Sequence, residues 1–156
     1  MQPLASKASV VIDTNVVLDM WVYKNKDVEA LKAALYRADV LWIATDVMRQ
    51  ELSRVLSYPH IHARLISAGL SPEEVMGSFD SLVGVVVVAP KSPYTCKDPD
   101  DQMFIDLAAA HKATLVSKDK CVLTMKNRLS RLGVSVVKVW TDELTPSSSP
   151  HISFRL

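Results

Sequence analysis

The fold of this chain is decided by the stretch Ser9-Val10-Val11-Ile12-Asp13-Thr14-Asn15-Val16-Val17-Leu18. The β-branched run at its start predicts a buried strand over residues 8–12, which ends abruptly at the polar residues. Asp13 is therefore expected at the carboxyl end of a core strand, the edge where ligands bind in open α/β sheets. A carboxylate there is costly to bury unless a cation, a basic side chain or helix N–H groups compensate its charge.

The rest of the chain alternates strand-like apolar runs with helical patterns. The apolar runs predict further strands over residues 40–44, 85–89, 114–117 and 134–140. Helical spacing and capping residues predict helices over residues 14–21, 26–38, 45–57, 60–68, 71–83, 98–112 and 119–132. Thr45 is the expected N-cap of the third of these helices, and Ser71-Pro72-Glu73-Glu74 predicts a capping box at the start of the fifth. Pro59 is expected to end or kink the helix that precedes it. This alternation indicates an α/β fold, a three-layer α/β/α sandwich around a parallel sheet of about five strands.

Length and composition indicate one ordinary globular domain. The chain has 156 residues, and we expect residues 1–144 to form the domain and residues 145–156 to form a Pro/Ser-rich tail. The formal net charge is +1, so that any binding of nucleic acid requires a local basic patch. The start of the chain lacks the apolar stretch of a signal peptide, and the apolar run at residues 82–89 is too short to span a membrane. We therefore expect a cytoplasmic protein.

Glu51 is the acidic residue that is hardest to explain as solvated surface. At 100° per residue, the apolar arc of its helix is formed by Val47, Met48, Leu52, Val55 and Leu56. Glu51 falls inside that arc. A carboxylate in such a position is either paired with Lys or Arg or has a role in binding.

Asp101 and Asp119 can join Asp13 and Glu51. Asp101 shares the sheet-facing side of its helix with Ile105, although Asp98-Pro99-Asp100-Asp101 is also an ordinary helix start with acids in its first turn. Asp119 follows a strand, where it can equally be a helix cap. Four carboxylates at one sheet edge would repel each other, and a hard divalent cation removes that cost. Oxygen ligands without histidine predict Mg²⁺ or Mn²⁺ rather than zinc.

At these residues the chain resembles the PIN-domain ribonucleases. The resemblance is carried by Val11-Ile12-Asp13-Thr14-Asn15-Val16, by Arg49-Gln50-Glu51-Leu52, by Asp98-Pro99-Asp100-Asp101-Gln102-Met103-Phe104 and by Val116-Ser117-Lys118-Asp119. The order and spacing match over about residues 8–140. Within the family, the chain is most similar to PIN-family toxin components, relatives of the VapC toxins of bacterial toxin–antitoxin pairs.

The resemblance implies a parallel five-stranded sheet with an acidic metal site at one edge. The metal-binding acids of the family correspond to Asp13, Glu51, Asp101 and Asp119, and the supporting polar positions to Asn15 and Ser117. One departure is that a second acid often follows two residues after the last of these acids, where this chain has Cys121. Asp100 is a possible substitute for Asp101, since the two residues are adjacent.

The function implied is Mg²⁺- or Mn²⁺-dependent endoribonuclease activity, with RNA as substrate and a small antitoxin protein and a second copy of the chain as possible partners. Lys118 and Lys120 are candidates for contacts with RNA phosphates, although a solvated helix face would look the same. One alternative is a haloacid-dehalogenase-like phosphatase, which needs a second Asp where Asn15 stands. A receiver-like phosphoacceptor domain needs paired acids after the first strand. The third alternative is a PIN scaffold that acts through partner binding without catalysis.

Overall fold

The protein is built around one parallel sheet of five strands. The computed structural model describes residues 7–142, so the predicted tail at residues 145–156 lies outside the described residues. The strands are β1 (Ser9–Ile12), β2 (Leu41–Ala44), β3 (Val83–Val85), β4 (Thr114–Val116) and β5 (Ser135–Val137). They pair in the order β3-β2-β1-β4-β5, with every pair parallel. The predicted parallel α/β fold is confirmed.

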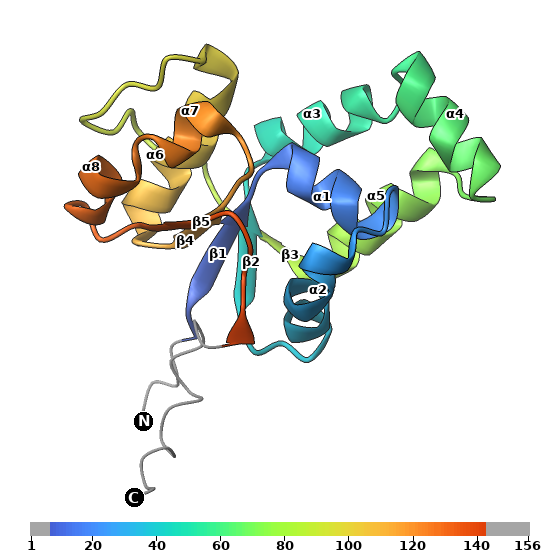
Figure 1. Ribbon diagram of the computed structural model, residues 1–156, viewed down its shortest axis with the longest axis horizontal. Coiled ribbons are helices and arrows are strands. Elements are labelled where there is room, and N and C mark those ends of the chain that lie inside the picture. Colours follow the sequence, from blue (N-terminus) through green and yellow to red (C-terminus); the bar gives the residue numbers. More distant parts are fainter. Residues whose placement is uncertain (1–6, 143–156) are drawn as a thin grey trace, which may run out of the picture.

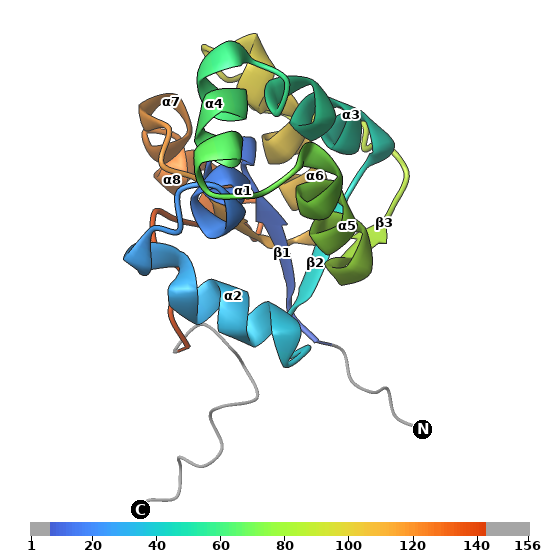
Figure 2. The ribbon, with the colours of Figure 1, turned by 90° about the vertical axis from the view of Figure 1, so that its right-hand side faces the viewer.

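Two layers of helices cover the sheet (Figure 1). On one side lie α1 (Thr14–Trp21), α2 (Glu29–Tyr36), α3 (Asp46–Val55), α4 (Pro59–Ser67) and α5 (Pro72–Leu82). On the other side lie α6 (Gln102–His111), α7 (Lys120–Leu123) and α8 (Lys126–Ser130). Short 3₁₀ turns, η1 (Lys26–Val28) and η2 (Pro99–Asp101), precede α2 and α6. Figure 2, in which the layer of α1–α5 faces the viewer, shows α2 at the lower end of this layer and α4 at its upper end.

The central strand β1 is apolar throughout because both faces of the sheet are covered. Val10, Val11 and Ile12 are each at most 3% exposed. Such strands read as continuous β-branched runs rather than as an alternating pattern. Trp42 of β2 joins the helical layer to the sheet, since its ring stacks on Trp21 at 5.8 Å and meets Phe79 edge-on at 5.1 Å.

Several helices begin where the sequence places a capping side chain. Asp13, Thr45 and Asp119 each accept a hydrogen bond from a backbone N–H in the first turn of α1, α3 and α7. Ser71 and Glu74 form a reciprocal capping box at the start of α5, as the sequence predicts. Two of these caps follow neighbouring strands: Asp13 comes directly after β1, and Asp119 comes three residues after the end of β4.

The structure corrects three details of the predicted elements. Strand β3 covers residues 83–85 rather than 85–89, because α5 ends at Leu82 and pairing with β2 begins at the next residue. The exposed Val87 and Val88 follow that edge strand instead of forming it. The helix expected at residues 119–132 is divided into α7 and α8. Pro59 begins α4 rather than ending α3, a position that its missing N–H allows.

The order of the strands places a topological switch between β1 and β4. The chain moves outward from β1 to β2 and β3 on one side, then crosses the sheet and continues from β4 to β5 on the other. The connections on the two sides of this point lie on opposite faces of the sheet (Figure 1). A crevice at the carboxyl ends of the strands is expected there. Within residues 7–142, no helix is long and apolar enough to cross a membrane.

Candidate metal centre

Asp13 is held at the carboxyl end of β1 by groups from both sides of the switch point. Its Oδ2 accepts a hydrogen bond from the Ser117 hydroxyl at 2.7 Å, and its Oδ1 accepts one from the Asn15 N–H at 3.2 Å. Ser117 Oγ in turn accepts a hydrogen bond from the Asp119 N–H at 3.1 Å. Ser117 is completely buried and Asp13 is 5% exposed. The two strand ends are thus joined through one hydroxyl.

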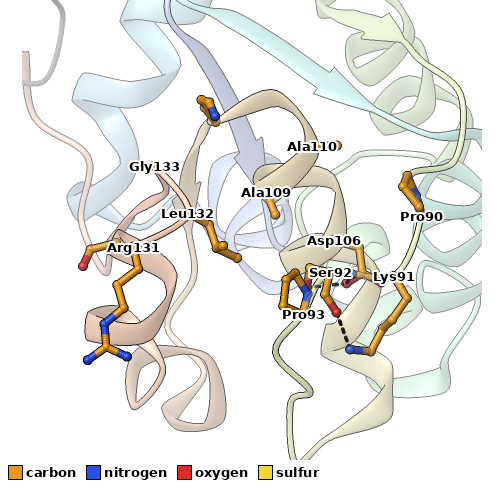
Figure 3. Close-up of a pocket in the computed structure, with 12 residues that line it drawn as sticks. Pro90, Lys91, Ser92, Pro93, Asp106, Ala109, Ala110, Arg131, Leu132 and Gly133 are labelled. Carbon is orange, nitrogen blue, oxygen red and sulfur yellow. Dashed lines mark hydrogen bonds between the residues drawn. The ribbon is translucent and has the colours of Figure 1, made fainter.

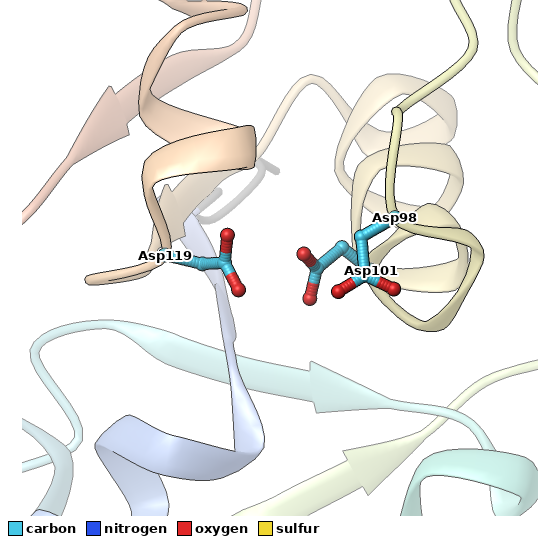
Figure 4. Close-up of side chains that lie close together, drawn as sticks. All are labelled: Asp98, Asp101 and Asp119. Carbon is cyan, nitrogen blue, oxygen red and sulfur yellow. The ribbon is translucent and has the colours of Figure 1, made fainter.

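Three carboxylates converge beside this hydrogen-bonded chain (Figure 4). Asp98, Asp101 and Asp119 each offer one oxygen, and these oxygens lie within 4.8 Å of one another. Asp98 and Asp101 come from the 3₁₀ turn before α6, and Asp119 faces them from the turn that follows β4. The close Asp101–Asp119 approach was predicted from the sequence, whereas the sequence suggested only a capping role for Asp98.

The donor set fits a hard divalent cation. Asp101 Oδ2 is buried and has no hydrogen-bond partner among the described residues, so that one carboxylate oxygen faces its neighbours uncompensated. Burial, together with the negative charges of Asp119 and Asp13, raises the pKa of Asp101 to about 7. Burial also raises the pKa of Asp13, although the bonds from Ser117 and Asn15 oppose that rise. Oxygen ligands of this kind suit Mg²⁺ or Mn²⁺.

Glu51 lies near this centre but outside the group of three. Its Oε1 accepts a hydrogen bond from the Thr14 hydroxyl at 3.2 Å, which ties α3 to the start of α1. Burial and the charges of Asp13 and Asp100 raise the pKa of Glu51. The side chain is half-buried, and Val47 beside it is 47% exposed. Glu51 therefore lies at the border of the buried face of α3. The prediction that places Glu51 inside the apolar arc of the helix is wrong on this point.

The other residues that the sequence predicts at the site differ in their burial and in their contacts with the carboxylates. Asp101 is buried and Asp100 is exposed, which identifies Asp101 as the member of the pair that points inward. Asn15 is exposed, and its backbone N–H donates a hydrogen bond to Asp13. Lys120 is exposed at the first position of α7, next to Asp119.

Sequence reasoning missed an ion pair between a buried carboxylate and a partly exposed lysine. Asp19 on α1 is buried, and its carboxylate contacts the Lys118 ammonium in the turn that carries Asp119. The signal for Asp19 was weak because a single acid near the end of a short helix is ordinary. The signal for Asp98 was its spacing of three residues from Asp101, which places both residues on one side of a helical turn.

A cavity of about 700 Å³ lies apart from the carboxylates (Figure 3). It is formed by the loop at residues 90–93, the second half of α6 and the turn before β5. Its carboxylate, Asp106, already accepts hydrogen bonds from Ser92 N, Ser92 Oγ and Gln102 Nε2. Because the turns before β4 and β5 lie at the amino ends of these strands, the cavity opens away from the acidic cluster.

The sequence profile of the PIN domain matches residues 9–121, which include all the carboxylates described above. The chain belongs to the PIN-domain family. The structure is similar to a chain in the crystal structure of VapBC2 from Rickettsia felis, which is bound to a DNA fragment from the VapBC2 promoter. The TM-score is 0.54 and the sequence identity is 14%. That likeness covers 82% of this chain and 98% of the other chain and concerns the fold. Among curated proteins, no sequence gives a significant match.

The raised pKa of Asp101 gives this PIN domain an expected pH dependence. Between its ordinary value of 3.8 and about 7, the folded protein retains a proton that the unfolded chain has lost. The free energy of unfolding of the metal-free protein should therefore fall as pH rises through this interval. Urea denaturation in EDTA at a series of pH values measures this fall, which should be shallower in Asp101→Asn.

The control for this experiment is Asp27→Asn, since Asp27 is exposed and lies away from the centre. Adding Mn²⁺ should raise the melting temperature of the wild type more at pH 8 than at pH 5, because the cation requires ionised carboxylates. Equal pH slopes in the wild type and Asp101→Asn would contradict the assignment.

The Asp19–Lys118 pair should contribute to stability more than a surface pair does. Replacing one member of a fully buried pair costs about 3–5 kcal/mol, and the partial exposure of Lys118 should reduce the cost of Lys118→Met to about 1–3 kcal/mol. The double variant Asp19→Leu/Lys118→Met should lose less than the sum of the single variants, because no buried charge is left unpaired. Chemical denaturation measures all three.

The matched control is Arg37→Met, which breaks the exposed pair between Arg37 and Asp39. This change should cost about 0–1 kcal/mol. A cost for Lys118→Met no greater than that of Arg37→Met would show that the Asp19 charge is compensated in another way.

Proposed function

We propose that this PIN domain is a Mg²⁺- or Mn²⁺-dependent endoribonuclease that hydrolyses phosphodiester bonds of RNA. The observation that supports this most strongly is the buried Asp101 carboxylate beside Asp98 and Asp119, whose Oδ2 has no hydrogen-bond partner within residues 7–142. Membership of the PIN-domain family supports nuclease chemistry. The motif resemblance assigns Asp13, Glu51, Asp101 and Asp119 to the metal-binding acids of the family, so that both lines of support include Asp101 and Asp119.

In this proposal Asp101, Asp119 and Asp13 hold the cation, and Asp98 or Glu51 completes the set directly or through water. When bound, the cation supplies a more acidic water for in-line attack at phosphorus and neutralises charge on the leaving oxygen. Ser117 keeps Asp13 oriented, and the Cys121 N–H, which donates to Asp119 Oδ1 at 2.8 Å, does the same for Asp119. Hydrolysis needs no side-chain nucleophile.

RNA phosphates would be contacted mainly by Lys120. Its side chain is exposed beside Asp119, whereas the Lys118 ammonium is shared with Asp19. Lys118 would contribute less to phosphate binding, because its side chain is partly exposed but its ammonium is paired with Asp19. The place of this reaction would be the cytoplasm.

Replacing the carboxylates tests the proposed activity. With Mn²⁺ and a labelled single-stranded RNA, Asp13→Asn and Asp101→Asn should lower the cleavage rate by at least about a hundredfold, because each removes a charge from the cation site. Glu51→Gln should lower it by about ten- to a hundredfold. Gel analysis of the RNA fragments measures the rates.

The matched controls are Asp27→Asn and Glu73→Gln, which remove exposed acids from η1 and α5. Both should retain the wild-type rate. Cleavage that survives Asp13→Asn and Asp101→Asn would place the activity elsewhere or in a contaminant. No cleavage by the wild type would favour a phosphatase, tested with a phosphomonoester, or a scaffold without catalysis.

We further propose that the protein is the toxin of a toxin–antitoxin pair. The similarity to VapBC2 supports this, as does the resemblance of the motifs to PIN-family toxin components. A small reading frame beside this one should then encode a protein that co-purifies with the chain and blocks RNA cleavage. Co-expression followed by gel filtration and an activity assay tests both points, and a neighbouring product that neither binds nor inhibits would argue against pairing.

A further inference from the structure

A second, smaller cavity adjoins the acidic centre. Its volume is about 300 Å³, and it lies between α3 with its following turn and the η2–α6 segment. The residues that matter for its chemistry are Val47, Glu51, Arg54, Tyr58, Asp100 and Met103. Glu51 lines this cavity, and its Oε1 accepts a hydrogen bond from Thr14, the residue that follows Asp13. The cavity therefore lies beside the carboxylates.

The walls of the cavity combine exposed apolar surface with a flat aromatic ring. Tyr58 is 41% exposed and Val47 is 47% exposed, although both belong to residue types that usually bury their side chains. The Tyr58 ring lies 6.5 Å from the His60 ring, which extends the aromatic surface. Met103, on the first turn of α6, adds an adaptable apolar wall. Such surfaces suit the flat face of a base.

The rim of the cavity carries both a hydrogen-bond donor and an acceptor. Arg54 supplies guanidinium N–H groups, and the exposed Asp100 supplies carboxylate oxygens. Arg54 also reduces the negative charge around Glu51, which otherwise opposes the approach of a polyanion. An apolar molecule alone would leave these groups without partners, whereas the edge of a nucleobase presents both donors and acceptors.

We propose that this cavity binds an unpaired nucleobase of the RNA, next to the phosphate held at the carboxylates. The inference rests on the proposed function, which makes RNA the ligand. A base can enter only when it is neither paired nor stacked in a helix, since in a duplex its faces and edge are covered. The cavity therefore selects single-stranded RNA. Tyr58 is the residue that contacts the face of the base, and Arg54 contacts its edge.

Binding measured without metal separates this inference from cleavage. A fluorescein-labelled single-stranded RNA of twelve nucleotides is titrated with protein in EDTA, and anisotropy gives Kd. Tyr58→Ala should raise Kd about five- to a hundredfold, the usual effect of losing one stacked base. Tyr58→Phe keeps the ring and should stay within about twofold of the wild type. The same RNA in a duplex should bind more weakly, with no effect of Tyr58→Ala.

The matched control is Tyr36→Ala, because Tyr36 is an exposed tyrosine of α2 at 56% exposure, away from the carboxylates. This variant should bind as the wild type does. Tyr58 makes no side-chain cap hydrogen bond at the start of α4, so that its replacement is compatible with folding, which circular dichroism verifies. Equal Kd values for Tyr58→Ala and Tyr36→Ala, equally tight binding of duplex RNA, or no binding of single-stranded RNA would each overturn the inference.

Methyl resonances locate the bound base. In protein labelled with ¹³C at the methionine methyl groups, single-stranded RNA should shift the Met103 signal and leave the Met76 signal of α5 in place. Binding without a Met103 shift would overturn the inference.

If RNA binds through Tyr58 but is not cleaved with Mn²⁺, the nuclease proposal fails alone. If RNA is cleaved and Tyr58→Ala changes neither Kd nor rate, the nucleobase site fails alone.

Discussion

The hydrogen-bonded chain from the Asp119 N–H through the Ser117 hydroxyl to Asp13 Oδ2 joins the two halves of the molecule. Ser117 and Asp13 are 104 residues apart in the sequence and only 2.7 Å apart at their oxygen atoms. The backbone continues the pairing at the same place, since the Asp13 N–H donates to the Val116 carbonyl at 3.0 Å. Asp13 and the backbone of Asp119 are therefore tied to the ends of two paired strands, which keeps this side of the centre fixed before any ligand arrives.

Helix starts make this concentration of acids tolerable. Asp13, Asp98 and Asp119 each accept a backbone N–H from the first turn of the segment that follows, where the helix end carries positive partial charge. A carboxylate has two oxygens and about four acceptor sites, so that capping leaves part of its capacity unused. A cap and a cation ligand are compatible roles for one side chain. Asp101 has no such cap, and its pKa is the one raised to about 7.

The sequence predicted the parts of the fold that depend on local pattern. The buried run of β1, the caps at Asp13 and Thr45, and the capping box at Ser71 each have a signature within a few residues, and the structure confirms them. The limits of β3 were predicted wrongly because a run of valines shows no point at which pairing must start. The strand begins where α5 ends.

The candidate site shows the same division between local and distant information. The convergence of Asp101 and Asp119 followed from their places at a helix start and a strand end, which any parallel sheet brings to one edge. The Asp19–Lys118 pair depends on how α1 lies against the turn after β4, and no local pattern reports that packing. Asp98 escaped notice for a different reason. Its role as a cap was sufficient to explain it, and a sufficient explanation hides a second role.

The placement of charge also suggests an order of events at the carboxylates. The chain as a whole is nearly neutral, with a formal net charge of +1, so that no long-range field draws in a polyanion. A phosphate that approaches Asp98, Asp101 and Asp119 meets like charge at short range, and this repulsion is strong in a partly buried site. A base can still bind in the cavity lined by Tyr58 without a cation, but a bound cation is needed to reverse the sign of the local field beside the phosphate. Lys118 alone does not reverse it, because Asp19 already balances its charge. The Asp19–Lys118 pair therefore fixes the turn without neutralising the centre.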